Sequence, residues 1–211
     1  MDKTKVDYKL YLVTDRQCLN HRDLCACIEE AILGGVTLIQ LREKSVSTLE
    51  FYETAKKVKA VADKHKVPLI INDRLDIAMA VNADGLHIGQ DDMPLEVARK
   101  LLGQDKLIGV SVFCREEALL AQEQGADYLG VGAIFSTPSK SDAKYVDLME
   151  LKQIKETVNI PVVGIGGINE SNLHRVLETG VDGVSVISAI LAKENCQKAA
   201  ANLREIMAAR W

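Results

Sequence analysis

TLIQLREKSVSTLEFYETAKKVKAVADKHKVPLIINDR, residues 37–74, contains the repeating unit of this chain. It begins with an apolar run at 37–42, continues through a segment at 49–65 with apolar residues at helical spacing, and returns to an apolar run at 68–72. Short continuous apolar runs are typical of strands in a parallel sheet whose outer face is covered. The stretch therefore predicts one strand–helix–strand unit.

The same alternation continues in both directions along the chain. The apolar runs lie at Leu10–Thr14, Thr37–Arg42, Pro68–Asn72, Gly85–Ile88, Leu107–Val112, Tyr128–Val131, Pro161–Gly164 and Gly183–Ile187. Eight parallel strands with right-handed crossovers close naturally into a barrel. An open doubly wound sheet is the alternative, but it more often has a glycine-rich turn after its first strand, where this chain has Thr14-Asp15-Arg16. We therefore expect an α/β fold, a single (β/α)8 TIM barrel forming one domain over residues 1–211.

Composition limits the classes of function. Hydrophobic residues make up 47% and charged residues 27% of the 211 residues, as in ordinary globular proteins. The net charge of −4 gives no electrostatic support to a nucleic-acid partner. The apolar runs have the length of strands, so we expect no membrane span and no signal peptide. Five scattered cysteines without a Cys-x-x-Cys pair predict reduced thiols in a cytoplasmic protein.

Polar side chains gather where the predicted strands end, which is the edge that carries the active site in such barrels. Gln40, Arg42 and Lys44 lie at the end of the second strand, Asn72 and Asp73 at the third, Asp92 after the fourth, Ser111 in the fifth and Lys140 after the sixth. Arg42 and Lys44 are two positions apart and point the same way if the strand continues. Together with Lys140 they predict an anion site, although a solvated loop also explains such charges.

Asp73 and Asp92 follow neighbouring predicted strands. Mg²⁺ usually takes one or two protein carboxylates and completes its shell with water and substrate oxygens, so this pair predicts a magnesium site that bridges to phosphate. A helix N-cap is the alternative interpretation of each aspartate taken alone.

A second anion site is predicted by the seventh and eighth strands. Loops after these two strands, with the start of a short helix, form the usual phosphate site of a barrel. Gly164–Gly167 follow the seventh strand, and Val186–Ser188 end the eighth, with Ser188 as the first residue of a possible helix. The segment 132–146 is long for its place and is predicted to be either disordered or a lid that could bring Lys140 over a bound diphosphate. His87, within the fourth predicted strand, shows no metal-ligand spacing, and we expect only a structural role for it.

Six motifs together resemble the thiamine phosphate synthase family over nearly the whole chain. They are Gln-Leu-Arg-Glu-Lys (40–44), Asn-Asp-Arg (72–74), Ala-Asp-Gly-Leu-His-Ile-Gly-Gln-Asp-Asp (83–92), Thr-Pro-Ser-Lys (137–140), Gly-Ile-Gly-Gly-Ile (164–168) and Val-Ile-Ser-Ala-Ile (186–190). The resemblance implies a (β/α)8 barrel that couples 4-amino-5-hydroxymethyl-2-methylpyrimidine diphosphate to a thiazole phosphate or its carboxylated form. The products would be thiamine phosphate and diphosphate, with CO₂ when the carboxylate is used.

The resemblance also implies roles for individual residues. The pyrimidine diphosphate would be bound by Gln40, Leu41, Arg42, Glu43, Lys44, Asn72, Ser111 and Lys140. Asp73 and Asp92 would bind Mg²⁺, and the thiazole phosphate would be bound by Thr137, Pro138, Ser139, Gly167, Ile187 and Ser188. Arg42, Lys44 and Lys140 would carry catalysis through charge. Ser139 stands where the family often has threonine, and its hydroxyl preserves the chemistry.

Two other functions fit parts of this pattern. A related thiazole tautomerase resembles the family around the second phosphate site but usually lacks the diphosphate and metal residues, which this chain keeps at Asn72, Asp73 and Asp92. A non-catalytic phosphate-binding barrel would have little reason to keep two anion sites and a metal pair. We expect two phosphorylated small-molecule substrates as the partners, while the oligomeric state stays open.

Overall fold

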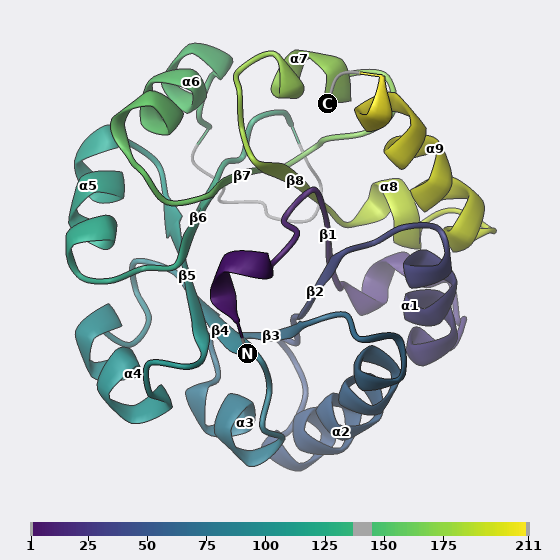
Figure 1. Ribbon diagram of the computed structural model, residues 1–211. Coiled ribbons are helices and arrows are strands. Elements are labelled where there is room, and N and C mark those ends of the chain that lie inside the picture. Colours follow the sequence, from purple (N-terminus) through teal and green to yellow (C-terminus); the bar gives the residue numbers. More distant parts are fainter. Residues whose placement is uncertain (1, 137–144, 210–211) are drawn as a thin grey trace.

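The computed structural model describes residues 2–136 and 145–209. Within them, eight parallel strands follow one another around a closed barrel, with the first strand paired to the eighth (Figure 1). The strands are β1 Leu10–Val13, β2 Leu38–Leu41, β3 Leu69–Asn72, β4 Gly85–Ile88, β5 Leu107–Val112, β6 Tyr128–Val131, β7 Val162–Ile165 and β8 Gly183–Val186. The predicted (β/α)8 barrel is confirmed, and each strand lies within one or two residues of its expected range.

Helices surround the barrel as an outer ring (Figure 1). They are α1 Leu24–Leu33, α2 Thr48–His65, α3 Leu75–Ala80, α4 Leu95–Leu102, α5 Arg115–Glu123, α6 Leu148–Thr157, α7 Leu173–Leu177, α8 Ser188–Leu191 and α9 Cys196–Ala208, with 3₁₀ turns η1 Lys3–Lys5 and η2 Arg16–Cys18. None of the helices in the described ranges is both long and apolar enough to span a membrane.

Side-chain oxygens set where several helices begin. Ser47 accepts a hydrogen bond from the backbone N–H of Glu50 at 3.1 Å, and Asp147 accepts one from Glu150 at 2.8 Å. These N-cap bonds satisfy amide groups that have no partner within the helix. They start α2 and α6 directly after the loops that leave the ends of β2 and β6.

Two separate apolar layers hold the barrel together. The barrel interior is filled by Tyr8, Tyr11, Leu38, Ile70, Leu107, Tyr128 and Val163. The alternate residues of the strands pack outward against the helices, as Leu12, Ile39, Leu41 and Ile71 do. Because successive strand side chains point to opposite faces, every second strand residue continues the interior layer toward the carboxyl ends of the strands.

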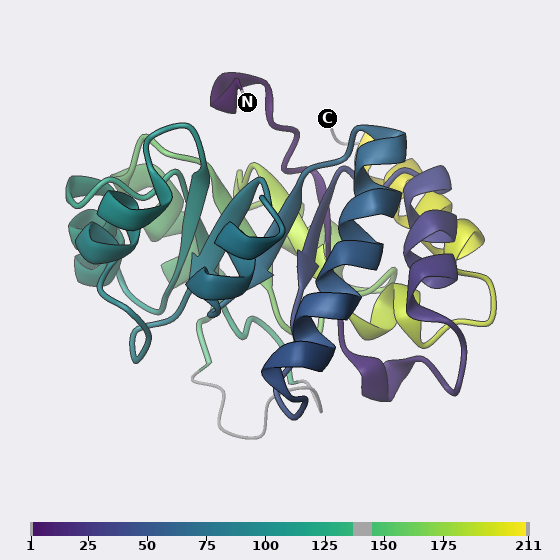
Figure 2. The ribbon, with the colours of Figure 1, turned by 90° about the horizontal axis from the view of Figure 1, so that it is seen from below.

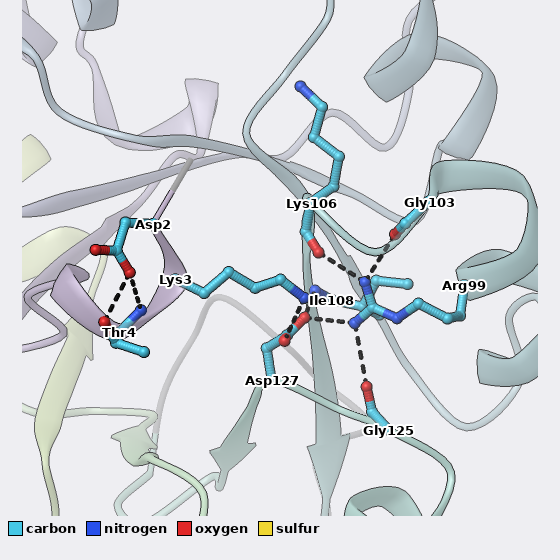
Figure 3. A network of polar contacts seen from close by, with 9 residues as sticks. All are labelled: Asp2, Lys3, Thr4, Arg99, Gly103, Lys106, Ile108, Gly125 and Asp127. Carbon is cyan, nitrogen blue, oxygen red and sulfur yellow. Dashed lines mark hydrogen bonds and ion pairs between the residues drawn. The ribbon is translucent and has the colours of Figure 1, made fainter.

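The amino ends of the strands are closed by the N-terminal segment. The 3₁₀ turn η1 lies across the axis of the barrel, on the side opposite the first turn of α2 (Figures 1 and 2). Figure 3 shows how it is held: Lys3 Nζ forms an ion pair with Asp127 Oδ1 at 2.9 Å. The other carboxylate oxygen, Asp127 Oδ2, forms an ion pair with Arg99 and accepts a hydrogen bond from the N–H of Ile108 at 2.7 Å. This face is therefore closed, and the opposite face is left for a ligand.

The aspartates that directly precede β4, β6 and β8 have the same structural role. Asp84, Asp127 and Asp182 accept hydrogen bonds from the first N–H of β3, the second of β5 and the first of β7, at 2.9, 2.7 and 2.7 Å. They satisfy amides at the start of the preceding strand. These residues therefore organise the closed face.

Candidate active site

A cavity of about 380 Å³ opens at the carboxyl ends of the strands. It gathers most of the residues that the sequence predicted for the two anion sites and the metal pair. Those that line it are Gln40, Arg42, Lys44, Asn72, Asp73, Asp92, Ser111, Gly167, Ile187 and Ser188. The prediction that the strand ends meet around one ligand space is thus consistent with the geometry.

Arg42 and Lys44 project into the cavity from the end of β2. The backbone N–H of Arg42 donates to the buried hydroxyl of Thr14 at 3.0 Å, which ties the end of β2 to that of β1. The guanidinium of Arg42 lies 4.0 Å from the carboxylate of Asp15. The ammonium of Lys44 forms an ion pair with Asp73. Two cations from a single strand end thus face the same space, as their two-residue spacing predicted.

Leu41 and Glu43 point away from this cavity. Leu41 is fully buried in the layer between the barrel and the helices. The carboxylate of Glu43 accepts a hydrogen bond from Arg16 Nε at 2.5 Å, and its side chain is only 4% exposed. Burial raises the pKa of the Glu43 carboxyl above its usual range, and the Arg16 guanidinium partly offsets the rise. The structure does not bring the side chains of Leu41 and Glu43 together with the other predicted site residues.

Asp73 and Asp92 form an acidic pair at the ends of β3 and β4. Asp73 has a backbone φ of +59°, a left-handed conformation that aspartate tolerates, and its N–H donates to the carbonyl of His87 at 2.8 Å. Asp92 accepts from the N–H of Gly89 at 2.7 Å. Burial raises the pKa of the Asp92 carboxyl; the Gly89 bond opposes this, and the adjacent Asp73 carboxylate adds to it. The bond from Gly89 holds Asp92 in the β4–α4 loop, and the N-cap residue of α4 is Pro94, so the alternative interpretation of Asp92 as a helix N-cap is wrong.

The acidic pair is a reasonable place for a hard cation. No group of three or more histidine, cysteine or acidic side chains in residues 2–136 and 145–209 is arranged to hold a metal, so a site saturated by protein ligands is not found there. Two carboxylates that repel each other beside an open cavity suit Mg²⁺, which keeps water and substrate oxygens in its shell.

The β7–α7 loop forms the other half of the cavity through close backbone packing. Gly167 has φ +64°, and a Cβ there would lie 2.5 Å from the carbonyl oxygen of Ser136. The carbonyl of Gly167 accepts from the side-chain amides of Asn169 and Asn172, at 3.1 and 2.9 Å. Only glycine fits this conformation at this approach, so the turn is fixed in shape.

The end of β8 leads into α8, which begins at Ser188 as predicted. Ile187 precedes it with φ −120° and ψ −84°, and its carbonyl accepts the N–H of Leu191 at 2.9 Å. The first amides of a helix have no partner within it and suit an anion. Gly167 follows the neighbouring strand β7 and lines the same cavity, so these residues have the arrangement expected of a barrel phosphate site.

The floor of the cavity contains residues that sequence reasoning missed. Tyr11 and His87 line it from β1 and β4, and Gln90 lines its wall and donates to the carbonyl of Ser111 at 2.7 Å. We expected a purely structural role for His87, yet its ring hydrogen bonds to the hydroxyl of Ser111 at 2.9 Å. The period of two was the available signal: His87 alternates with the apolar Leu86 and Ile88, which pack outward, and so points inward.

Four predicted site residues, Thr137, Pro138, Ser139 and Lys140, lie outside the described residues, as does most of the predicted lid. The chain leading toward them is described. Gly132 and Ala133 line the cavity, and the N–H groups of Ile134 and Phe135 donate to the carbonyls of Ile165 and Gly166, at 2.9 and 3.0 Å. The segment thus leaves β6 along the β7 side of the cavity.

Comparison with known proteins agrees with this geometry. A model of the family described as thiamine monophosphate synthase matches residues 10–190. A thiamine-phosphate synthase of Clostridium acetobutylicum is 63% identical over 202 residues, which are 96% of each chain. One from Clostridium tetani is 58% identical, covering 96% of this chain and 97% of that one. The solved thiamine phosphate pyrophosphorylase from Pyrococcus furiosus is 44% identical, has a TM-score of 0.89 and matches over 97% of both chains.

Proposed function

The chain belongs to the thiamine monophosphate synthase family, and on that premise we propose that its cavity joins a pyrimidine diphosphate to a thiazole phosphate. The substrates are 4-amino-5-hydroxymethyl-2-methylpyrimidine diphosphate and the thiazole phosphate or its carboxylated form. The observation that carries the proposal is one cavity with two unlike halves. Cations and carboxylates line it at β2 to β4, and a glycine-rich turn and a helix start line it at β7 and β8.

The half at β2 to β4 takes the pyrimidine diphosphate. Arg42 offers a planar fork and Lys44 a point charge, and diphosphate oxygens accept from both. Gln40 of β2 and Asn72 of β3 add amide groups to this half, and Ser111 of the adjoining β5 adds a hydroxyl. Lys140 is proposed to add a third cation. Leu41 and Glu43 support this half from outside, by packing and by the ion pair with Arg16.

Asp73 and Asp92 are proposed to hold Mg²⁺ beside this diphosphate. Their donor set is oxygen only, and Lys44 already neutralises Asp73 when no metal is bound. When bound, the ion would neutralise negative charge on the diphosphate oxygens.

The half at β7 and β8 takes the thiazole phosphate. Gly167, Ile187 and Ser188 offer backbone donors and a hydroxyl, with no cation from β7 or β8 among the described residues that line the cavity. This suits a phosphate that is only held and does not leave. Thr137, Pro138 and Ser139 are proposed to complete its binding.

The reaction follows from two anion sites in one cavity. The bond between the pyrimidine methylene carbon and the diphosphate oxygen breaks, and its electron pair leaves with the diphosphate. The thiazole nitrogen then gives its lone pair to the stabilised methylene cation and forms the new carbon–nitrogen bond. Arg42 and Lys44 stabilise the charge that grows on the leaving group, and the phosphate half aligns the thiazole. No protein nucleophile takes part.

We further propose that this chemistry takes place in the cytoplasm. The five cysteines are all free, which suits a reducing compartment.

The test is synthesis of thiamine phosphate, read as fluorescent thiochrome after oxidation. The purified protein is incubated with both substrates and with each substrate alone. Product that requires both substrates supports the proposal. A protein that instead isomerises the carboxythiazole phosphate alone and makes no thiamine phosphate is a tautomerase, and the proposal is then wrong.

A further inference from the structure

A chain of hydrogen bonds crosses the barrel interior and connects two side chains of the cavity. Gln40 Nε2 donates to the hydroxyl of Tyr11 at 2.8 Å. The hydroxyls of Tyr11 and Tyr128 are 2.8 Å apart, and that of Tyr128 is 3.0 Å from His87 Nδ1. His87 Nε2 is 2.9 Å from the hydroxyl of Ser111. We call these five residues the interior chain.

Two glycines make room for the rings of the interior chain. Gly109 is paired with Tyr128 across β5 and β6, and a Cβ on it would lie 2.1 Å from Tyr128 Cζ. Gly130 is paired with Ser111, and a Cβ on it would lie 3.1 Å from His87 Cε1. Side chains at these two positions would displace the rings. The positions of the Tyr128 and His87 rings therefore depend on glycine at 109 and 130.

The direction of the interior chain follows from counting protons. An amide nitrogen only donates, so the oxygen of Tyr11 accepts from Gln40. Among the contacts of the described residues, the hydroxyl of Tyr128 is the acceptor within reach of the single proton of Tyr11, which sets the direction. The proton of Tyr128 then goes to His87 Nδ1. Burial raises the pKa of both phenols, so each keeps its proton. An Nδ1 that accepts from Tyr128 leaves the ring proton on Nε2, which lies 2.9 Å from the hydroxyl of Ser111 and donates to it.

We propose that Tyr128 is a positioning residue that holds His87 as the Nε2–H tautomer and thereby turns the Ser111 hydroxyl into a donor toward the pyrimidine diphosphate. The ligand in this statement rests on the proposed function. A hydroxyl that accepts from His87 has its own proton available for a group in the cavity. Negative charge grows on the diphosphate as its bond to carbon breaks, so this donor stabilises the transition state more than bound substrate.

The tautomer is measured on the wild-type protein without substrate. Long-range ¹H–¹⁵N correlation spectra of the imidazole nitrogens distinguish the two tautomers, and the His87 signals are assigned by their loss in His87→Gln. We expect a proton on Nε2 and an unprotonated Nδ1 that accepts a hydrogen bond. A proton on Nδ1 would reverse the interior chain and overturn the proposal, whether or not any variant folds.

The kinetic test compares two phenylalanine substitutions in the same aromatic cluster. Tyr128→Phe removes the donor to His87 and keeps the ring. Tyr8→Phe is the matched control, because the Tyr8 ring packs against Tyr128 with centroids 5.2 Å apart while the interior chain does not pass through its hydroxyl. We expect Tyr128→Phe to lower kcat about tenfold, with KM for the pyrimidine diphosphate changed less than about twofold, and Tyr8→Phe to match the wild type.

Equal kinetic effects of the two substitutions would show that the hydroxyl of Tyr128 only supports packing, and would overturn the proposal. The tautomer measurement needs no turnover. It therefore still decides the direction of the interior chain if the wild type makes no thiamine phosphate, an outcome that would contradict the proposed function alone.

Discussion

The ammonium group of Lys44, at the end of β2, forms an ion pair with the carboxylate of Asp73, at the end of β3. The pair joins a cation proposed for the diphosphate to a carboxylate proposed for Mg²⁺. On the proposed function, Lys44 and Mg²⁺ would compete for the Asp73 carboxylate before substrate arrives. Mg²⁺ at Asp73 would then leave Lys44 available to the diphosphate.

Lys44→Gln is expected to bind Mg²⁺ more tightly without substrate and to turn over more slowly. Removing one cation near Asp73 gains about 1 kcal/mol at this exposed position, or roughly fivefold in Kd, while the diphosphate loses a charge partner. Isothermal titration with Mg²⁺ and steady-state kinetics measure the two effects. The control is Lys56→Gln, an exposed lysine of α2 that pairs with Glu53. Weaker Mg²⁺ binding by Lys44→Gln would contradict this account.

Arg42→Ala is expected to lower kcat about 100-fold, because a charge-stabilising group at the leaving diphosphate is lost. Lys140→Ala is expected to act in the same direction. Arg115→Ala serves as the control, since this arginine begins α5 outside the lining of the cavity and pairs with Glu150 at 3.7 Å. Unchanged steady-state rates in both Arg42→Ala and Lys140→Ala would remove the diphosphate from this half of the cavity.

Gly167→Ala is expected to raise KM for the thiazole phosphate at least about tenfold, with a smaller effect on the pyrimidine diphosphate. The added Cβ would meet the carbonyl of Ser136 at 2.5 Å, so the backbone of the phosphate half must shift. Gly180→Ala isolates the cost of positive φ alone, because Gly180 has φ +80° and open space around it. Equal KM values in the two variants would count against a phosphate at the β7–α7 loop.

Glu43→Gln is expected to match the wild type in stability near pH 4 and to exceed it near pH 7. The folded-state pKa of Glu43 is raised by burial, so the wild type loses stability as pH rises from the unfolded pKa through the folded one. Glutamine carries no charge to bury and is insensitive to pH over this range. Urea unfolding at several pH values measures the difference. A less stable Gln variant at pH 7 would show that the ion pair with Arg16 outweighs burial.

Arg99→Ala is expected to lower the free energy of unfolding by about 2 kcal/mol and to leave kcat unchanged. Loss of one partner from a fully buried ion pair costs more than this. The side chains of Arg99 and Asp127 are 10% and 17% exposed, so water partly compensates the carboxylate that is left. Both lie at the closed face of the barrel (Figure 3). Lys3→Ala removes the more exposed partner of Asp127 and should cost about 0.5 kcal/mol. A large fall in kcat for Arg99→Ala would contradict the separation of the two faces.

The barrel and the half of the cavity at β2 to β4 were predictable from the sequence, because both follow from the alternation of side chains along strands. The apolar runs predicted the eight strands, and the spacing of Arg42 and Lys44 predicted a common direction. The resemblance also named Leu41 and Glu43, since motifs are continuous while strand faces alternate. Their side chains point outward.

Other features depend on contacts between distant segments. The interior chain needs Gly109 opposite Tyr128, which is a pairing across two strands and has no local signal. The closed face needs Lys3 and Arg99 to meet at Asp127, from three separate parts of the chain. The close approach of Gly167 to Ser136 likewise arises only when β6 and β7 lie side by side.

Magnesium dependence of thiamine phosphate synthesis tests the central claim most directly. The wild-type protein is assayed with both substrates after treatment with EDTA, and again after Mg²⁺ is added back. The account predicts no product with EDTA, full recovery with Mg²⁺, and little recovery in Asp73→Asn or Asp92→Asn at the same concentration. Full synthesis without a divalent ion would remove the two aspartates from their metal role and contradict the diphosphate half of the site.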